Sequence, residues 1–230
     1  MNLSSKDLRQ VLVFQNVSDK DLDQIFKNSI TRSIEEGGFF FFQSDTADFL
    51  YVLISGQVKL LQTDLTGHPV NLRTIHPWQM FGALGAVKDN AHYPATAQAM
   101  EDSSALAIRG VFLREMMKTR PILSLDIMNL MTTYIQELQA RYRELATERV
   151  EQRIARALLR LTAQGGNKSE EGIELAFSRQ DLAEMSGTTL YTVSRVLAEW
   201  ERKELVHTGR EKVRIVNPHE VVRIAEGLEK

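Results

Sequence analysis

Short apolar runs alternate with turn-forming residues between about residue 31 and residue 108. The runs FLYVLISG, QVKLLQTD and VNLRTI are rich in β-branched and aromatic side chains, which are typical of strands. Ser55-Gly56 and Thr66-Gly67 supply residues that suit tight reversals. Strands at spacings of about ten residues predict a small antiparallel barrel or jelly roll. Two short amphipathic helices, at about 4–12 and 18–28, are predicted before it.

A longer helix is predicted from Pro121 to about Ala146. Its apolar positions repeat every seven residues in two series, namely Ile127, Tyr134 and Arg141, and Met131, Leu138 and Leu145. This repeat favours pairing with a parallel partner helix, although a helix that lies on its own barrel would bury the same stripe. Arg141 departs from the apolar pattern, which leaves the register open near the end of the helix.

The last third of the chain shows helical periodicity again. A helix at about 148–163 is predicted to end at Gly165-Gly166, and the polar run 167–172 is expected to be a loop. Ser178 is a good N-cap for a following helix that closes at Gly187, and Thr189 can cap the next one. That second helix places its apolar residues on one face, which we expect to be buried: Val193, Val196, Leu197 and Trp200.

The opposite face of this second helix carries residues that can read DNA. They are Leu190, Tyr191, Ser194 and Arg195. Two helices joined by so short a turn have the geometry of a helix-turn-helix whose second helix enters a major groove, and the alternative is an ordinary helical hairpin. The run LVHTGREKVRIV then predicts two strands around Gly209, with Arg210, Lys212 and Arg214 positioned as a wing over phosphates.

Composition narrows the function. The chain has no cysteine, which excludes disulfides, thiol nucleophiles and cysteine-bound iron–sulfur clusters. No run approaches the roughly 20 apolar residues of a membrane span, and the N-terminus does not resemble a signal peptide, so we expect a cytoplasmic protein. The net charge of −2 requires that DNA be bound by a local patch. Residues 147–230 hold 14 Lys and Arg and 14 Asp and Glu.

The order of these parts resembles the cyclic-AMP receptor protein/FNR superfamily of bacterial transcription regulators. The resemblance rests on SRQDLAEMSGTTLYTVSRVL, on FLYVLISGQVKL, and on FGALGAV followed by YPATAQA. It implies an α+β fold with an N-terminal antiparallel β-roll sensor domain (1–120), a dimerisation helix (121–147) and a C-terminal winged helix-turn-helix (148–230). It also implies a homodimer that binds double-stranded DNA at a pseudo-palindromic operator and contacts RNA polymerase.

The resemblance assigns DNA contacts to particular residues. Phosphate contacts are expected from Ser178, Arg179 and Gln180, with Thr189 at the start of the next helix. In the family the recognition helix often carries a glutamate, with Ser or Gly and then Arg three and four residues later. Here Ser194 and Arg195 stand at the second pair, but Tyr191 occupies the glutamate position. Arg195 can still contact guanine O6 and N7, but Tyr191 cannot accept from a cytosine amino group as a carboxylate does. We therefore expect a half-site that differs from the family's best-known ones.

The sensor residues also depart from the family. Its nucleotide-binding members hold the ribose with Gly-Glu-Leu and the phosphate with Arg-Ser-Ala, whereas this chain has Gly82-Ala83-Leu84 and Tyr93-Pro94-Ala95. Loss of both polar anchors predicts that no cyclic nucleotide is bound. The YPATAQA run is similar to the nitric-oxide and redox branch, thought to bind haem, for which His92 or His76 would be candidate ligands.

Three possibilities for the sensor domain stay open: haem, an unidentified small effector, or no ligand. A cupin-like metal enzyme is not expected, because no compact His-x-His cluster, phosphate loop or nucleophile–base pair is found. The resemblance makes activation the more common mode, with the Thr66-Gly67-His68 hairpin lying where activators can touch polymerase. Effector, operator sequence and target genes are not given by the sequence.

Overall fold

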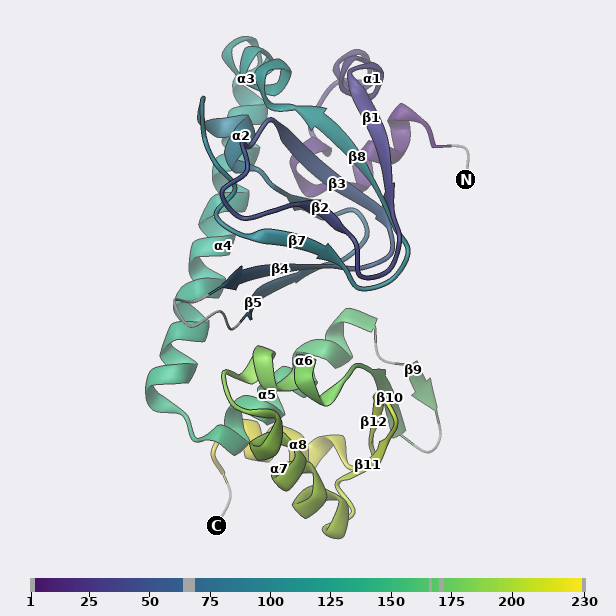
Figure 1. The fold of residues 1–230 in the computed structure, drawn as a ribbon, viewed down its shortest axis with the longest axis vertical. Helices are drawn as coiled ribbons and strands as arrows, with labels where there is room; N and C mark the ends of the chain where they lie inside the picture. Colours follow the sequence, from purple (N-terminus) through teal and green to yellow (C-terminus); the bar gives the residue numbers. More distant parts are fainter. Residues whose placement is uncertain (1–2, 64–68, 166, 170–171, 229–230) are drawn as a thin grey trace. The chain divides into compact units, whose positions relative to one another are not determined.

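The computed structural model describes residues 3–63, 69–165, 167–169 and 172–228. The chain divides into two compact units, Met1–Gln136 and Glu137–Lys230, which we call the sensor unit and the DNA-binding unit (Figure 1). Each has its own hydrophobic core. The long helix α4 (Pro121–Thr147) begins in the sensor unit and ends in the DNA-binding unit.

The chain opens with two 3-10 segments, Ser5–Gln10 and Leu12–Phe14, in place of the single helix predicted at about 4–12. Val11 lies between them in extended conformation, with φ −79° and ψ 124°, which ends the first segment. Helix α1 (Asp19–Lys27) follows and confirms the second predicted helix. Ser18 caps it by accepting a hydrogen bond from the Asp21 amide.

The predicted β region forms two antiparallel four-stranded sheets, and the three runs singled out in the sequence are β3, β4 and most of β5. One sheet has the order β1-β8-β3-β6, with β1 Ser29–Ile34, β8 Ser103–Arg109, β3 Phe49–Ser55 and β6 Met80–Phe81. The other has the order β2-β7-β4-β5, with β2 Phe39–Phe41, β7 Thr96–Ala99, β4 Val58–Thr63 and β5 Pro69–Ile75.

Alternation along the central strands creates two buried faces. Leu50 and Val52 of β3 pack against the helical layer, whereas Tyr51 and Leu53 pack toward the second sheet. Gly56 makes the predicted turn after β3 at φ +85°, where an added Cβ would lie 2.7 Å from the Asp102 carbonyl oxygen. The other predicted turn, Thr66-Gly67, and His68 beside it lie outside the described residues.

Two further helices belong to the sensor unit, one within the β region and one after it. The short α2 (Leu84–Val87) follows β6, and α3 (Gly110–Thr119) follows β8. The sequence analysis did not predict α3, whose Leu113 and Met116 are buried in the helical layer. Arg120, directly after α3, donates a hydrogen bond of 2.9 Å to Asp21 of α1. No helix of the described residues is long and apolar enough to cross a membrane.

Helix α4 confirms the long helix predicted from Pro121, but the first predicted heptad series does not face solvent. Ile127 is 4% exposed and lies in the core of its own sensor unit. Tyr134 packs against that core and lies under the Arg73 guanidinium of β5, 3.8 Å from its ring centroid. The helix therefore lies on its own β-roll along this stripe, as the alternative interpretation had it.

The exposed apolar stripe of α4 includes a series that lies one residue further along the helix than the predicted series Ile127, Tyr134 and Arg141. Its members, in two heptad series, are Met128, Ile135 and Tyr142, and Leu138 and Leu145. They range from 53% to 74% exposed. The half-buried Met131 lies at the seven-residue spacing before Leu138. This register removes Arg141 from the apolar series and restores a continuous heptad pattern.

After the end of α4, the DNA-binding unit continues with α5 (Val150–Gly165), close to the predicted helix. The polar run expected to be a loop instead contributes β9 (Asn167–Ser169) and the start of β10 (Gly172–Ala176). These pair with β12 (Lys212–Ile215) and β11 (Val206–Gly209) in the order β11-β12-β10-β9. Helices α6 (Arg179–Ser186), α7 (Leu190–Arg202) and α8 (Pro218–Ala225) complete the unit.

Candidate nucleic-acid interface

Helix α6 begins at a complete capping box. The Ser178 hydroxyl accepts from the Asp181 amide at 3.1 Å, and the Asp181 carboxylate accepts from the Ser178 amide at 3.1 Å. Both bonds satisfy amides that a helix N-terminus leaves without partners. The predicted cap is confirmed, and it places Arg179 and Gln180 in the first turn, where both side chains are exposed.

The turn after α6 uses Gly187 in the left-handed region, with φ +61° and ψ 47°. Arg153 of α5 holds this turn, because its guanidinium donates to the carbonyl oxygens of Ser186 at 2.9 Å and Gly187 at 3.3 Å. A third bond reaches the Glu148 carbonyl oxygen at 3.1 Å. Sequence reasoning missed Arg153, since nothing in its position on α5 shows that it caps a different helix.

Helix α7 presents two different faces. Its Thr189 cap accepts from the Thr192 amide at 3.2 Å, and the four residues predicted to be buried are at most 2% exposed. On the opposite side Leu190 is 48% and Tyr191 79% exposed. The Arg195 side chain is 53% exposed and lies 3.7 Å from Glu151. An exposed pair at this distance leaves Arg195 available to another acceptor.

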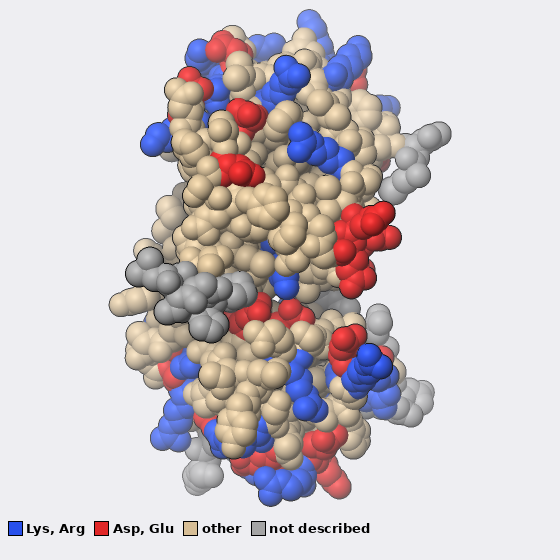
Figure 2. Space-filling model, in the orientation of Figure 1, with Lys and Arg blue, Asp and Glu red and all other residues tan. Residues whose placement is uncertain are grey.

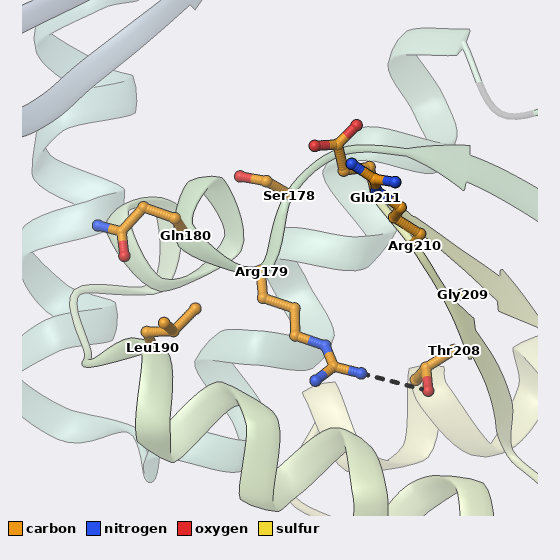
Figure 3. A pocket seen from close by; sticks show the side chains of 8 residues that line it. All are labelled: Ser178, Arg179, Gln180, Leu190, Thr208, Gly209, Arg210 and Glu211. Carbon is orange, nitrogen blue, oxygen red and sulfur yellow. Dashed lines mark hydrogen bonds between the residues drawn. The ribbon is translucent and has the colours of Figure 1, made fainter.

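A groove of about 640 Å³ runs between the start of α6, the start of α7 and the tip of the wing. Figure 3 shows its lining, in which Arg179 points toward Thr208 of β11 while Gln180 and Leu190 lie on the other side. The wing is anchored to α6, because the Phe177 amide donates to the Glu211 carbonyl oxygen at 3.0 Å. The predicted phosphate-contacting residues Ser178, Arg179, Gln180 and Arg210 therefore share one surface.

The three predicted wing cations differ in their surroundings. Lys212 lies 3.2 Å and Arg214 3.4 Å from the Glu174 carboxylate, and the hydrogen bond from Lys212 is the main reason that the pKa of Glu174 is lowered. Arg210 at the wing tip is exposed and makes no ion pair within the described part of the chain. Among the described residues, Arg210 is thus a wing cation without an ion-pair partner.

Acidic residues elsewhere in this unit are bound by arginines away from the groove. Glu144 at the end of α4 accepts two bonds from Arg160 of α5, at 3.0 and 2.9 Å. Glu148 accepts two bonds of 2.9 Å from Arg156. Positive and negative side chains are correspondingly interspersed on the face drawn in Figure 2.

The predicted effector residues do not form one polar site in the sensor unit. Tyr93 and Ala95 are buried, while His92, Pro94 and Leu84 are exposed. The Tyr93 ring stacks on Phe41 with 3.7 Å between centroids, and its hydroxyl donates to the Phe49 carbonyl oxygen at 2.7 Å. Burial raises the pKa of Tyr93 well above its ordinary value. Gly82 is at φ +69° and fits closely, since an added Cβ would lie 3.1 Å from the Tyr93 ring.

His92 and Tyr93 therefore face opposite sides of the same segment. His92 forms a backbone bridge with Thr46 while its side chain faces out, and Tyr93 contributes to an aromatic cluster that fills the space between the sheets. The other members of that cluster are Phe40, Phe41, Tyr51 and Phe81. His76, the second candidate haem ligand, is half-buried after β5. Within the described residues no group of three or more His, Cys, Asp or Glu is placed to hold a metal ion.

The site combines a capped α6, a glycine turn, an α7 with one exposed face and an adjoining β wing. These features define a winged helix-turn-helix DNA-binding protein. A model of the Crp-like helix-turn-helix domain matches residues 152–224, and a model of the cyclic nucleotide-binding domain matches residues 31–120. Together the two models account for more than half of the chain. The chain belongs to the Crp/Fnr family of transcription regulators.

Similar proteins span nearly the whole chain. The cyclic AMP receptor protein of Thermus thermophilus is 27% identical, over 94% of this chain and 97% of that protein. The transcriptional activator protein Anr of Pseudomonas protegens is 29% identical, over 92% and 86%. The structure of CLP, the c-di-GMP responsive global regulator of Xanthomonas campestris, matches with a TM-score of 0.77 at 20% identity, over 86% and 99%. These relatives are transcription regulators and not enzymes.

Proposed function

We propose that the protein is a homodimeric transcription activator that binds a pseudo-palindromic operator. The exposed heptad stripe of α4 carries this proposal. Large apolar side chains repeated every seven residues on one helix face are the pattern by which two parallel helices pair. A twofold axis along this helix generates two copies of α7, which matches an operator built of two inverted half-sites.

Each copy of α7 is proposed to enter a major groove. Arg195 reads guanine through its two parallel donors, while Leu190, Tyr191 and Ser194 meet neighbouring base edges or thymine methyl groups. Ser178, Arg179, Gln180 and Thr189 contact phosphates on one side, and Arg210 does so from the wing. Lys212 supports this contact less, because Glu174 already binds it.

The sensor unit is proposed to respond to something other than cyclic AMP or cyclic GMP. The Tyr93 ring lies buried among aromatic side chains, and a phosphate there would find no cation from Tyr93-Pro94-Ala95. Calorimetric titration with either nucleotide at micromolar concentration is expected to release no binding heat. A saturable signal with a stoichiometry of one per chain would contradict this part of the proposal.

The operator proposal is tested by selecting DNA from a random pool with the full-length protein at fixed salt. The selected sequences should contain an inverted repeat whose half-sites are about one helical turn apart. Sedimentation of the complex should give two chains per duplex. Enrichment of a single, unrepeated site bound by one chain would overturn the dimeric arrangement. A transcription assay with the selected site upstream of a promoter tests activation.

A further inference from the structure

Glu201, near the end of α7, accepts two hydrogen bonds from one residue of the wing, Thr208. Its carboxylate accepts the Thr208 amide N–H on one oxygen and the Thr208 hydroxyl on the other, each at 2.8 Å. These two bonds lower the pKa of Glu201, the backbone bond having the larger effect. The carboxylate is therefore an acceptor-only group across the neutral pH range.

This arrangement fixes the direction in which the Thr208 hydroxyl bonds. Its one hydrogen is donated to Glu201, so its lone pairs remain for a donor on the other side. Arg179 supplies that donor, with Nη2 lying 3.5 Å from Thr208 Oγ1 (Figure 3). A hydrogen-bond chain with a fixed direction results. The Arg179 guanidinium donates to the Thr208 hydroxyl, and this hydroxyl donates to the Glu201 carboxylate. This hydrogen-bond chain joins the first residue of α6 to the wing and to the end of α7.

The wing does not depend on these hydrogen bonds for its fold. Thr208 lies opposite Val213 in the ladder between β11 and β12, and Val206 and Val213 bury their side chains in the core of the unit. The Phe177 amide holds the wing tip independently. The Thr208 amide donates to Glu201 of α7, and the Thr208 hydroxyl donates to the same carboxylate while it accepts from Arg179.

We infer that Thr208 and Glu201 are positioning residues that hold Arg179 in the orientation in which it meets a DNA phosphate. The inference rests on the proposed function, in which Arg179 contacts the DNA backbone. An arginine without such a hydrogen bond would lose side-chain freedom when it binds DNA. The hydrogen bonds from Arg179 to Thr208 and from Thr208 to Glu201 remove much of that freedom in advance. Glu201 acts through Thr208 and Arg179 and touches no phosphate itself.

The experiment measures how the operator affinity of the full-length protein changes with salt. Arg179→Ala should reduce the slope of log K against log salt by about one, the value for one lost phosphate contact. Thr208→Val keeps the shape and the amide but removes the hydroxyl, and it should reduce the slope nearly as much. Thr208→Ser should restore the wild-type slope. In the Arg179→Ala background, Thr208→Val should cause no further change.

Glu201→Gln separates bond direction from simple attachment. Its amide can still link α7 to Thr208, but its NH₂ group would donate to the hydroxyl and compete with Arg179. The slope should fall although the thermal unfolding temperature stays close to that of the wild type. Thermal unfolding of each variant, followed by circular dichroism, reports whether the fold is retained.

The possible results lead to different conclusions. If Arg179→Ala lowers the slope while Thr208→Val and Glu201→Gln leave it unchanged, the positioning role is wrong and the proposed function stands. If Arg179→Ala itself leaves the slope unchanged, the placement of Arg179 on DNA is wrong and the proposed function has to be revised. Equal losses from Thr208→Val in the wild-type and Arg179→Ala backgrounds would assign Thr208 a role independent of Arg179 and overturn the inference.

Discussion

Leu145, at the end of α4, packs against Gly187 in the turn between α6 and α7, so closely that a Cβ added to the glycine would lie 2.5 Å from Leu145 Cδ2. Leu145 is at the same time a member of the exposed heptad stripe. One leucine therefore contacts the helix-turn-helix and, in the proposed dimer, the partner helix. Gly187 has two reasons to be glycine, namely this contact and its φ of +61°.

Gly187→Ala should lower the free energy of unfolding of the DNA-binding unit by about 1–3 kcal/mol, combining the left-handed backbone with displacement of Leu145. Urea unfolding followed by Trp200 fluorescence in a Trp78→Phe background measures it. Gly209→Ala is the matched control, because its Cβ meets only the flexible Lys212 side chain, at 2.9 Å, and should change stability by less than about 0.5 kcal/mol. Equal losses in both variants would contradict the packing argument.

Arg195→Ala should relax base preference at one symmetric position in each half-site and weaken operator binding by about 1–3 kcal/mol. Arg210→Ala should instead weaken all DNA sequences similarly and reduce the salt slope by about one. A binding assay on a panel of single-base operator variants separates the two effects. Were Arg195→Ala to keep the wild-type preferences while Arg210→Ala altered them, α7 would not be the reading element.

Leu138→Glu should convert the dimer to a monomer, because it places two carboxylates in the apolar stripe close to the twofold axis. Sedimentation equilibrium over a range of protein concentrations measures the association. Val111→Glu is the control: Val111 of α3 is as exposed, at 63% against 67%, but lies on a different helix. A Leu138→Glu protein that sediments as the wild type does would exclude this stripe as the interface.

Tyr93→Phe should destabilise the sensor unit by about 1–3 kcal/mol. The Tyr93 hydroxyl bonds both polar groups of the Phe49 backbone, accepting from the amide at 3.1 Å and donating to the carbonyl oxygen at 2.7 Å. Scanning calorimetry measures the loss. Tyr191→Phe, which removes a hydroxyl from a side chain that is 79% exposed, should leave the unfolding temperature unchanged.

Acid should weaken the contact between α1 and the segment after α3. The hydrogen bond from Arg120 holds the pKa of Asp21 below its ordinary value of 3.8. A depressed pKa contributes stability that is present above pH 3.8 and is lost as the pH falls through the lower, folded value. Asp21→Asn should therefore reduce stability at pH 7 and flatten its fall as the pH drops below 3.8. An unchanged pH profile in calorimetry would show that the pair contributes nothing.

The sequence predicted best those elements whose signals are local. Ser178 and Thr189 mark the starts of α6 and α7 through their side-chain hydroxyls, Gly187 marks the end of α6 through its left-handed backbone, and the structure confirms all three. The sheet strands were predicted from alternation and turn residues in the same way. The order of these parts then led to the family resemblance, which the comparisons confirm.

Features that depend on distant residues were not predicted. Periodicity located a heptad pattern on α4 but could not choose between Ile127 and Met128, since which face is covered depends on how the β-roll lies against the helix. Arg153 acts on a turn 33 residues further along the chain. Glu201 acts on Thr208 only seven residues away, but their contact requires that β11 fold back beside α7. The polar residues 167–169 form a strand because β10 offers them a partner, not because of any β propensity of their own.

The ion pairs within the DNA-binding unit also affect how strongly the protein is expected to bind DNA of unrelated sequence. Residues 147–230 carry 14 cations and 14 anions, and arginines such as Arg156 and Arg160 form ion pairs with glutamates of the same unit. Beyond a Debye length of about 8 Å such a balanced unit exerts little pull on a passing duplex. In the proposed function, we therefore expect DNA of unrelated sequence to be held mainly by the groove cations and to dissociate quickly. Discrimination between operator and bulk DNA comes from this weak background as much as from tight contacts at the operator.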